Sequence, residues 1–214
     1  MSVCPLCQAP SIAFFDDTRG RVFDRCTEAE CATVHVRPEC WLTEPDEASR
    51  YDQHDNDLEQ PGYLNYLAPL LEAIRAAAYP RMTRALDFGC GPTKSIATLL
   101  RAEHDWRVYD KYFAADEGVW REDFDLIAAS EVLEHLREPE KELRRLLARL
   151  RPGGSLFIMT QLYEDGINFA RWHYQRDPTH LVFFTKSGLT RFMGRAGLRL
   201  ERTGRHVLHF KRKD

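Results

Sequence analysis

Two pairs of cysteines near the N-terminus have the residue type and spacing to hold a metal ion. Cys4 and Cys7 form a C-x2-C pair, and Cys26 and Cys31 follow as a second, looser pair after eighteen intervening residues. Two thiolate pairs separated by a hairpin-length segment are typical of a zinc ribbon, in which four protein ligands close a tetrahedron and leave no open position. We therefore expect a structural zinc at these four cysteines, within a ribbon-like element over residues 1–42.

A bound metal would hold together a segment that is too short to bury a core of its own. Residues 12–15 and 21–23 could form its two strands. His35 or Cys40 could replace one ligand, and four unrelated free cysteines are the alternative interpretation. The chain begins Met-Ser-Val-Cys without the apolar stretch of a signal peptide, so we expect a cytoplasmic protein whose thiols stay reduced.

A second set of residues that could bind a ligand lies in a glycine-rich stretch, Asp87-x-Gly89-x-Gly91. Apolar residues before it predict a buried strand and those after it a helix, an arrangement that forms a ligand cradle at the edge of an open α/β sheet. A dinucleotide turn would need glycine where the chain has Lys94, and no phosphate P-loop sequence is present. Asp87, an acid just ahead of the glycines, suits a cation such as the ammonium group of an amino-acid moiety.

Asp110 lies 23 positions beyond Asp87, after a strand expected over residues 106–109. An acid about 20 residues past a glycine turn is where a pair of ribose hydroxyls is bound. A solvated loop aspartate is the alternative. Together the two acids predict a ligand that carries both an ammonium group and a ribose.

A third set, Glu131, Glu134 and His135, is spaced at i, i+3 and i+4 directly after a buried strand expected over residues 124–129. In a helical turn these side chains share one face. His180, with His173 as a further candidate, could approach from a long aromatic and polar insertion. Two carboxylates and two imidazoles would suit a divalent metal ion.

Two alternatives to this second metal site stay open. Without a metal, His135 or His180 could act as a general base, with Glu131 beside them. In the structural alternative, Glu134 caps a helix or pairs with Arg137, and His135 is a satisfied core histidine.

The rest of the chain supplies elements that could position these groups. Residues 43–63 are acidic and polar and predict a connector, with a helical piece near 46–51, or a lid that folds over the ligand site. Only thirteen residues separate Asp110 from the next strand, so one sheet element should be abbreviated or lost there. Hydrophobic periodicity predicts helices over 64–78, 93–100, 138–150 and 186–196, a strand over 155–160, and a closing hairpin over 197–203 and 205–210.

Three stretches resemble one family. Residues 86–92 (Leu-Asp-Phe-Gly-Cys-Gly-Pro) resemble motif I of the class I S-adenosylmethionine-dependent methyltransferases, and residues 131–136 and 150–154 resemble its later motifs. The resemblance covers about residues 64–210. It implies an α/β fold with a Rossmann-like, mostly parallel sheet and an antiparallel C-terminal strand, and S-adenosylmethionine as cofactor.

The resemblance also implies cofactor contacts. These are expected at Asp87, Gly89, Gly91, Asp110 and Ser130. The family often has a third glycine where this chain has Thr93, so the turn departs from the pattern there. The run from Glu131 to His135, with His180, is locally similar to metal-dependent 2′-O-methyltransferases of small RNA, and the same run is similar to quinone-pathway O-methyltransferases.

These features predict a methyltransferase that acts on an oxygen atom of a small-molecule acceptor, because a hydroxyl needs a base or a metal whereas an amine does not. An RNA-directed methyltransferase and a non-catalytic zinc-ribbon binding module with a vestigial cofactor fold are the alternatives. The net charge of −3 gives no general attraction to nucleic acid. No apolar run approaches the roughly 20 residues of a membrane span, so we expect no membrane partner.

Overall fold

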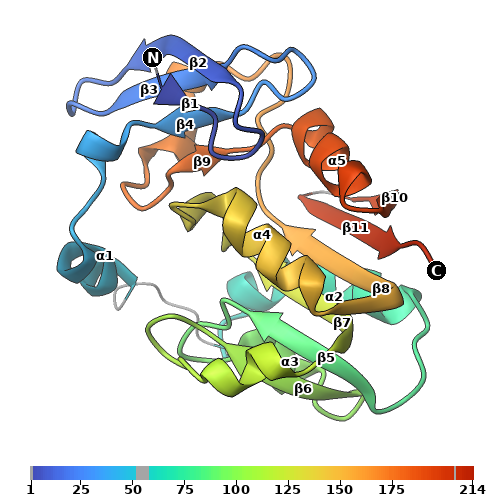
Figure 1. Ribbon diagram of the computed structural model, residues 1–214. Coiled ribbons are helices and arrows are strands. Elements are labelled where there is room, and N and C mark those ends of the chain that lie inside the picture. Colours follow the sequence, from blue (N-terminus) through green and yellow to red (C-terminus); the bar gives the residue numbers. More distant parts are fainter. Residues whose placement is uncertain (1, 52–57, 205) are drawn as a thin grey trace. The chain divides into compact units, whose positions relative to one another are not determined.

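The structure, a computed structural model, describes residues 2–51, 58–204 and 206–214 (Figure 1). It divides the chain into two compact units, and each unit draws on three stretches of sequence. The first unit contains Met1–Gln53, Leu133–Arg144 and Gln161–Ala196. The second unit contains His54–Val132, Arg145–Thr160 and Gly197–Asp214. The two units are described separately below.

The second unit is built on a six-stranded mixed sheet. Its strands are β5 (Thr83–Phe88), β6 (His104–Tyr109), β7 (Phe124–Ser130), β8 (Leu150–Met159), β10 (Leu198–Thr203) and β11 (Val207–Arg212), in the order β10-β11-β8-β7-β5-β6. β5 pairs in parallel with β6 and β7, and β7 pairs in parallel with β8, whereas β11 is antiparallel to both β8 and β10. The Rossmann-like sheet with an antiparallel C-terminal strand is thus confirmed.

The loss of a sheet element after Asp110 is also confirmed. The described residues between β6 and β7 contain a 3-10 helix, Glu117–Arg121, and an isolated bridge between Asp110 and Ala114, but no strand that joins the sheet. A parallel crossover needs a dozen or more residues. The segment is therefore long enough to return the chain to β7 but not to add a strand and helix.

Helix α2 (Pro61–Ala76) covers part of this sheet. Leu67, Leu70 and Ile74 recur at helical spacing and pack in one apolar cluster with Leu126 of β7 and Phe157 of β8. Pro69 lies inside α2, and the helix is continuous through it. The apolar stripe of α2 thus predicts its buried face correctly.

Several element boundaries differ from those expected. Helix α3 (Ser95–Leu99) is shorter than residues 93–100, because Lys94 at its start adopts φ +50°, outside the helical region. Helix α4 (Pro139–Ala148) ends before Leu150, which instead begins β8 and pairs with Phe124. The Pro-Gly-Gly run after Leu150 predicts the end of a helix, but it forms an irregular part of β8, where the register shifts.

The first unit contains a five-stranded antiparallel sheet. Its strands are β1 (Ser2–Val3), β2 (Pro10–Asp16), β3 (Val22–Cys26), β4 (Val34–Val36) and β9 (Val182–Phe183), in that order across the sheet. Val34 pairs with Phe183, and His35 pairs with Val182. The N-terminal ribbon therefore continues, strand by strand, into the insertion that carries His180.

Aromatic side chains fill the core of this first unit. Phe23, Phe169 and Phe183 lie in one buried cluster, with ring centroids 5.2–6.0 Å apart. The remaining helical elements of this unit are α1 (Glu44–Tyr51), α5 (Lys186–Arg195) and four 3-10 helices, Pro38–Cys40, Leu133–His135, Phe169–Arg171 and His173–Arg176. α1 matches the helical piece expected near 46–51. The rest of the expected lid includes residues 52–57, which lie outside the described residues.

In the part of the chain that the structure describes, no helix combines the length and the apolar character needed to cross a membrane.

Candidate functional site

The glycine turn of the second unit follows the C-terminal end of β5. Gly89 has φ +70° and Gly91 has φ +60°, a region of backbone conformation that glycine adopts without a steric penalty. The N–H of Gly89 donates to the carbonyl oxygen of Tyr109 at 2.7 Å. A Cβ atom on Gly89 would lie only 2.3 Å from Cγ2 of Val132, so no larger residue fits without a shift.

Asp87 lies beneath this turn with 2% of its surface exposed. Its Oδ2 accepts a hydrogen bond from the N–H of Ala97 in α3 at 3.1 Å. Burial raises the pKa of Asp87 to about 7, against the opposing effect of that hydrogen bond. The N–H of Ile96 also donates to this side chain, and a carboxylate with two backbone donors still has acceptor positions for a cation or a donor group.

Asp110 ties the turn to the loop after β6. Its Oδ2 accepts from the N–H of Gly91 at 3.0 Å, and its Oδ1 accepts from the N–H groups of Tyr112 at 2.8 Å and Phe113 at 3.1 Å. A carboxylate offers about four acceptor positions. The three backbone bonds leave room for a ligand hydroxyl while they hold the side chain in one orientation.

A cluster of hydroxyl groups stands at the start of α3, where the third glycine of the family is replaced. Thr93 Oγ1 lies 2.7 Å from Ser95 Oγ, and the hydroxyl of Tyr63 donates to the same Ser95 oxygen at 3.0 Å. Tyr63 belongs to α2, so its position beside the turn depends on tertiary packing. In the sequence, Tyr63 is the last residue of the acidic and polar stretch 43–63, and the polar character of that stretch is the one signal that indicates it.

Ser130 and Glu131 lie where β7 ends. Ser130 is the last residue of β7 and pairs with Met159 of β8. Glu131 has φ +51°, which is strained for a residue with a side chain, and its N–H donates to the carbonyl of Met159 at 2.8 Å. Among the described residues, Glu131 is not a member of either group of side chains that could hold a metal.

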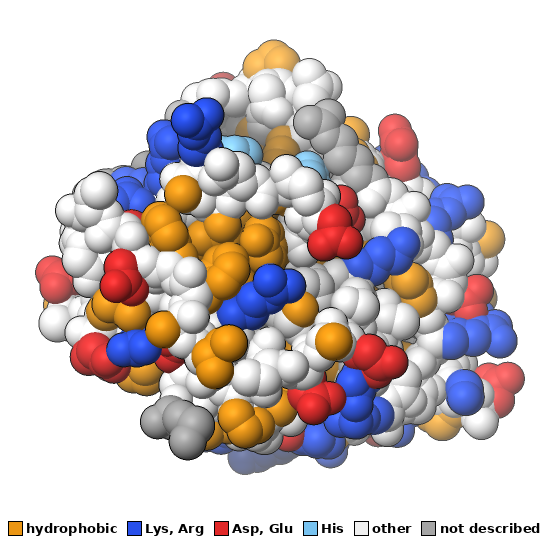
Figure 2. Space-filling view, turned by 90° about the horizontal axis from the view of Figure 1, so that it is seen from above, with side chains coloured by type: hydrophobic (Ala, Val, Ile, Leu, Met, Phe, Trp, Pro, Cys, Tyr) orange, Lys and Arg blue, Asp and Glu red, His pale blue; other side chains and the backbone are white. Residues whose placement is uncertain are grey.

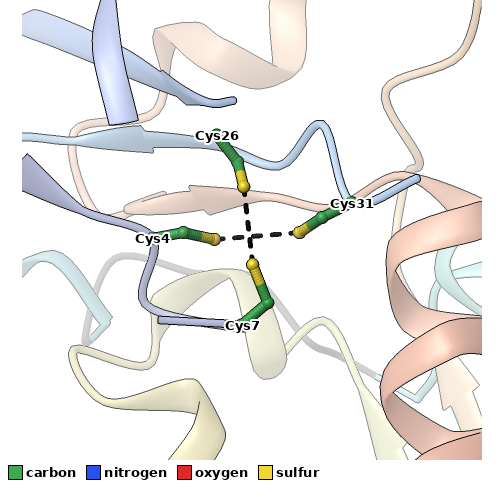
Figure 3. Close-up of side chains that lie close together, drawn as sticks. All are labelled: Cys4, Cys7, Cys26 and Cys31. Carbon is green, nitrogen blue, oxygen red and sulfur yellow. Dashed lines mark hydrogen bonds between the residues drawn. The ribbon is translucent and has the colours of Figure 1, made fainter. Parts of the chain in front are cut away.

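The first unit brings the four N-terminal cysteines together (Figure 3). Their sulfur atoms point toward one common centre, with Cys4 Sγ 3.8 Å from Cys31 Sγ and Cys7 Sγ 3.4 Å from Cys26 Sγ. With Zn–S distances of about 2.3 Å, a regular tetrahedron places its sulfurs about 3.8 Å apart. A disulfide would need about 2.05 Å. The geometry fits a tetrahedral metal site.

The electrostatics of the four thiols also favour a bound cation. The hydrogen bond from Cys4 lowers the pKa of Cys31 to about 5, whereas the same bond and burial raise the pKa of Cys4. Burial raises the pKa of Cys26 to about 12. Four thiolates can therefore coexist here only with a compensating positive charge.

The two alternative ligands lie elsewhere. His35 Nε2 is 3.1 Å from Ser11 Oγ, and Cys40 Sγ is 3.7 Å from the carbonyl oxygen of Gly20. Neither belongs to the four-cysteine group.

A second group in the first unit joins Glu134, His135 and His180, whose ligand atoms lie within 4.8 Å of one another. His135 Nδ1 lies 3.0 Å from the carbonyl oxygen of Thr179, and His180 Nδ1 lies 2.7 Å from that of Tyr174. Because a carbonyl can only accept, each Nδ1 carries a hydrogen, and each neutral imidazole keeps its lone pair on Nε2.

Burial and the charge of His135 lower the pKa of His180 to about 4, so His180 is neutral near pH 7. Glu134 is fully buried, and its Oε1 accepts a hydrogen bond from the Tyr174 hydroxyl at 2.6 Å. The group we name the histidine cluster (Glu134, His135 and His180) therefore combines one buried carboxyl group with two imidazoles whose Nδ1 atoms are held by backbone carbonyls.

Two sequence alternatives are decided by neighbouring contacts. Arg137 pairs with Glu47 of α1 at 3.0 Å and not with Glu134. His173 lies at the start of a 3-10 helix and is not part of the histidine cluster. The contacts of Tyr174 with Glu134 and of Thr179 with His135 join residues distant in sequence, so the spacing of residues alone does not indicate them.

Comparison with known proteins identifies a family and solved structures of similar fold. The family described as "Methyltransferase domain" matches residues 46–203. No curated protein is significantly similar in sequence.

Solved structures of similar fold share little sequence. An O-methyltransferase family protein from Burkholderia thailandensis has a TM-score of 0.57 at 14% identity; the match covers 78% of this chain and 63%, less than two thirds, of that chain. The 1,6-didemethyltoxoflavin-N1-methyltransferase of the same organism, with 1,6-didemethyltoxoflavin and S-adenosylhomocysteine bound, has a TM-score of 0.55 at 16% identity, covering 94% of this chain and 99% of that chain. Magnesium protoporphyrin IX methyltransferase from Synechocystis PCC 6803, with S-adenosylmethionine bound, has a TM-score of 0.53 at 12% identity, covering 80% and 92%.

The family match spans most of the chain, and the sheet order and the glycine turn agree with it. The chain belongs to the class I S-adenosylmethionine-dependent methyltransferases.

Proposed function

We propose that this methyltransferase transfers the methyl group to an oxygen atom of a small-molecule acceptor. The observation that carries the proposal is the histidine cluster, in which two imidazoles are held at Nδ1 by backbone carbonyls, with Nε2 as the other ring nitrogen, beside a buried carboxyl group. A hydroxyl acceptor must lose its proton during transfer, whereas a neutral amine already has a lone pair. A site equipped with bases therefore favours oxygen over nitrogen.

The donor would be held by the glycine turn. S-adenosylmethionine supplies a methyl group already activated on a sulfonium. The residues fit its shape and charge, because Gly89 leaves no space for a Cβ atom, Asp87 can accept from the ammonium group, and Asp110 has an acceptor position for ribose. Ser130, at the end of β7, is a further proposed contact.

The histidine cluster would act on the acceptor. We propose that His135 or His180 takes the acceptor proton at Nε2 and that Glu134 stabilises the imidazolium that forms.

The same three side chains could instead hold a divalent metal ion. Histidines that bind metal usually donate the other ring N–H to a carbonyl or carboxylate, which is the arrangement of both imidazoles here. A bound metal would lower the pKa of the acceptor hydroxyl. Glu131, expected as a fourth ligand, stays a prediction for this site.

We also propose a structural zinc ion at Cys4, Cys7, Cys26 and Cys31. The convergence of four sulfur atoms supports it. Such a site suits a reducing compartment such as the cytoplasm, where thiols are kept free for the metal.

A small-molecule acceptor is favoured over RNA. Two of the similar structures described above are methyltransferases named for 1,6-didemethyltoxoflavin and magnesium protoporphyrin IX, both small molecules. On the face shown in Figure 2, Lys and Arg side chains lie among Asp and Glu side chains and do not form one basic stripe. Nucleic-acid binding relies on such clustered positive charge.

The test has two parts. Calorimetry should detect binding of S-adenosylmethionine to the purified chain, and incubation of a metabolite extract with methyl-labelled donor should give a labelled small molecule whose new methyl group lies on oxygen. A product labelled on nitrogen or carbon, or label found only in RNA, would overturn the proposed acceptor.

A further inference from the structure

The geometry points to Arg21 as a positioning residue that holds His135 and His180 in place from the N-terminal ribbon. The inference rests on the proposed function only in assigning these histidines to methyl transfer. The positioning itself follows from contacts within the first unit, and it gives the ribbon a role in the chemistry besides metal binding.

Arg21 is almost fully buried, with 8% of its surface exposed, and its guanidinium group is surrounded by backbone oxygens. Nη1 donates to the carbonyls of Gln175 at 2.8 Å and Asp177 at 2.9 Å, and Nη2 donates to the carbonyl of His180 at 2.5 Å. The group also lies over the ring of Phe23, 4.9 Å from its centroid. One side chain of the ribbon thus forms hydrogen bonds with three carbonyls of one loop, residues 175–180.

That loop orients both imidazoles. His180 belongs to it, and the Thr179 carbonyl accepts from His135 Nδ1 at 3.0 Å. Thr179 is fixed in turn, because its N–H and hydroxyl both donate to Asp177 Oδ1, at 2.9 and 2.6 Å. A shift of the 175–180 backbone would therefore move both ring nitrogens that face Glu134.

The next residue joins the loop to the ribbon and to Glu134. The N–H of Leu181 donates to the carbonyl of Glu134 at 2.7 Å, and the carbonyl of Leu181 accepts from the N–H of Val36 at 2.8 Å. The loop is consequently held on one side by β4 and on the other by the guanidinium group of Arg21.

Arg21 is itself held by the turn between β2 and β3. Asp17 Oδ1 accepts from the N–H groups of Arg19 and Arg21, each at 2.8 Å, and the N–H of Asp17 donates to the carbonyl of Arg21 at 2.9 Å. Gly20, with φ +86°, allows the chain to turn back. The base of the side chain therefore has a fixed direction.

The chemistry of the contact calls for arginine. A planar guanidinium can serve several carbonyls at fixed angles where an ammonium cannot, and Nη1 and Nη2 of Arg21 do so, although its Nε has no partner among the described residues. Burial lowers the pKa of Arg21 to about 10, so it stays charged near pH 7. If Arg21 only filled space, an apolar side chain of similar volume would give a more favourable free energy of folding.

The test compares Arg21→Ala and Arg21→Lys with Arg19→Ala, all in the zinc-loaded full chain. Arg19 is a matched control, because it lies on the same turn and donates to the carbonyl of Arg176 at 2.9 Å but is half exposed. Two readouts do not depend on activity. Amide exchange reports the order of residues 175–181, and imidazole ¹⁵N shifts, assigned with single-histidine variants, report which ring nitrogen carries hydrogen.

We expect Arg21→Ala to raise amide exchange in residues 175–181 at least tenfold and to remove the single Nδ1–H tautomer of His135 and His180. The affinity for S-adenosylmethionine should stay within twofold, kcat should fall at least tenfold, and methylguanidinium should restore part of kcat where methylammonium does not. Arg21→Lys should lie between wild type and Arg21→Ala, which keeps the test usable if the alanine variant folds poorly. Arg19→Ala should resemble wild type.

Unchanged exchange and tautomers in both Arg21 variants would overturn the inference, and they would do so even if His135→Ala and His180→Ala abolish activity. Altered exchange and tautomers with full kcat would support the positioning and would instead count against the proposed use of these histidines. The two failures are therefore distinguishable.

Discussion

Val132 occupies the space that a side chain on Gly89 would need: its Cγ2 lies 2.3 Å from the position of a Cβ atom there. The contact links the glycine turn after β5 to the segment after β7. It explains why this turn tolerates only glycine at position 89, for reasons of space as well as of its φ of +70°.

Gly89→Ala is expected to weaken binding of S-adenosylmethionine by more than tenfold, because the turn must shift away from Val132. Calorimetry measures the affinity. Gly197→Ala is the matched control, since Gly197 has a similar φ of +85° but open space around it. That variant should lose about 1 kcal/mol of folding stability, because a residue with a Cβ atom is disfavoured at positive φ. Its affinity for S-adenosylmethionine should stay unchanged. The double variant Gly89→Ala with Val132→Ala should recover part of the binding, and an equal loss in single and double variants would contradict the steric explanation.

Asp87 should make donor affinity depend on pH. Burial raises its pKa to about 7, so the carboxyl is largely protonated at pH 6 and ionised at pH 8. Since the ammonium group of the donor prefers the carboxylate, we expect the Kd to be about tenfold weaker at pH 6 than at pH 8. Asp87→Asn should bind weakly with a flat profile over this range. A wild-type profile as flat as that of the variant would contradict the assignment.

In the protein without bound S-adenosylmethionine, the carboxyl group of Asp87 should also make the free energy of unfolding depend on pH. The unfolded chain has an ordinary aspartate pKa of about 3.9, so between about pH 4 and pH 7 the folded state binds more protons. The contribution of Asp87 to the free energy of unfolding should therefore fall as pH rises through this window. Urea unfolding at pH 5, 6 and 7 measures the slope, which should be smaller in Asp87→Asn.

The sequence predicts the second unit better than the first. Alternating glycines and short apolar runs locate β5, β7 and the turn, because those signals are local. The start of β8 is missed, since Pro152 and Gly153 indicate a helix end but lie within an irregular strand. The φ of +50° at Lys94 has no local signal, so α3 begins later than expected.

In the first unit, decisive contacts join residues far apart in sequence. The cysteine spacing predicts a four-sulfur group, and the structure brings those sulfurs together. It also brings Glu134 and His135 to His180, but it does not include Glu131 in that group. The hydrogen bond from Tyr174 to Glu134 spans 40 positions and leaves no pattern in a single sequence.

The histidine cluster should govern the chemical step and not donor binding. We expect His135→Ala and His180→Ala each to lower kcat by about 10²–10⁴-fold, the usual value of a positioned base, with donor affinity within twofold of wild type. His173→Ala is the control, because His173 lies in the same insertion but outside the cluster. Steady-state kinetics with the identified acceptor measure the effect. Equal losses in all three variants would indicate a general disturbance of the insertion.

Removal of metal ions distinguishes a histidine cluster that acts as a general base from one that holds a divalent metal ion. If the cluster acts as a base alone, EDTA should leave kcat unchanged as long as the cysteine-bound zinc is retained. If it holds a divalent metal, EDTA should abolish activity, and added metal should restore it in wild type but not in His180→Ala. Zinc content must be measured in the same samples, so that loss from the cysteines is not mistaken for loss from the cluster.

The four-cysteine group should bind one zinc ion per chain that stabilises the first unit. Cys4→Ser and Cys26→Ser are each expected to lose the zinc, because three sulfur ligands no longer close the tetrahedron. Cys40→Ser should retain it, since Cys40 lies outside the group, and elemental analysis of the purified proteins makes the comparison. Because binding free energy at such sites contributes to folding, amide exchange in β2, β3 and β4 should rise in the two zinc-free variants while β5 and β7 keep their protection. Zinc retained in Cys4→Ser and Cys26→Ser at the wild-type level would show that these thiols are not its ligands.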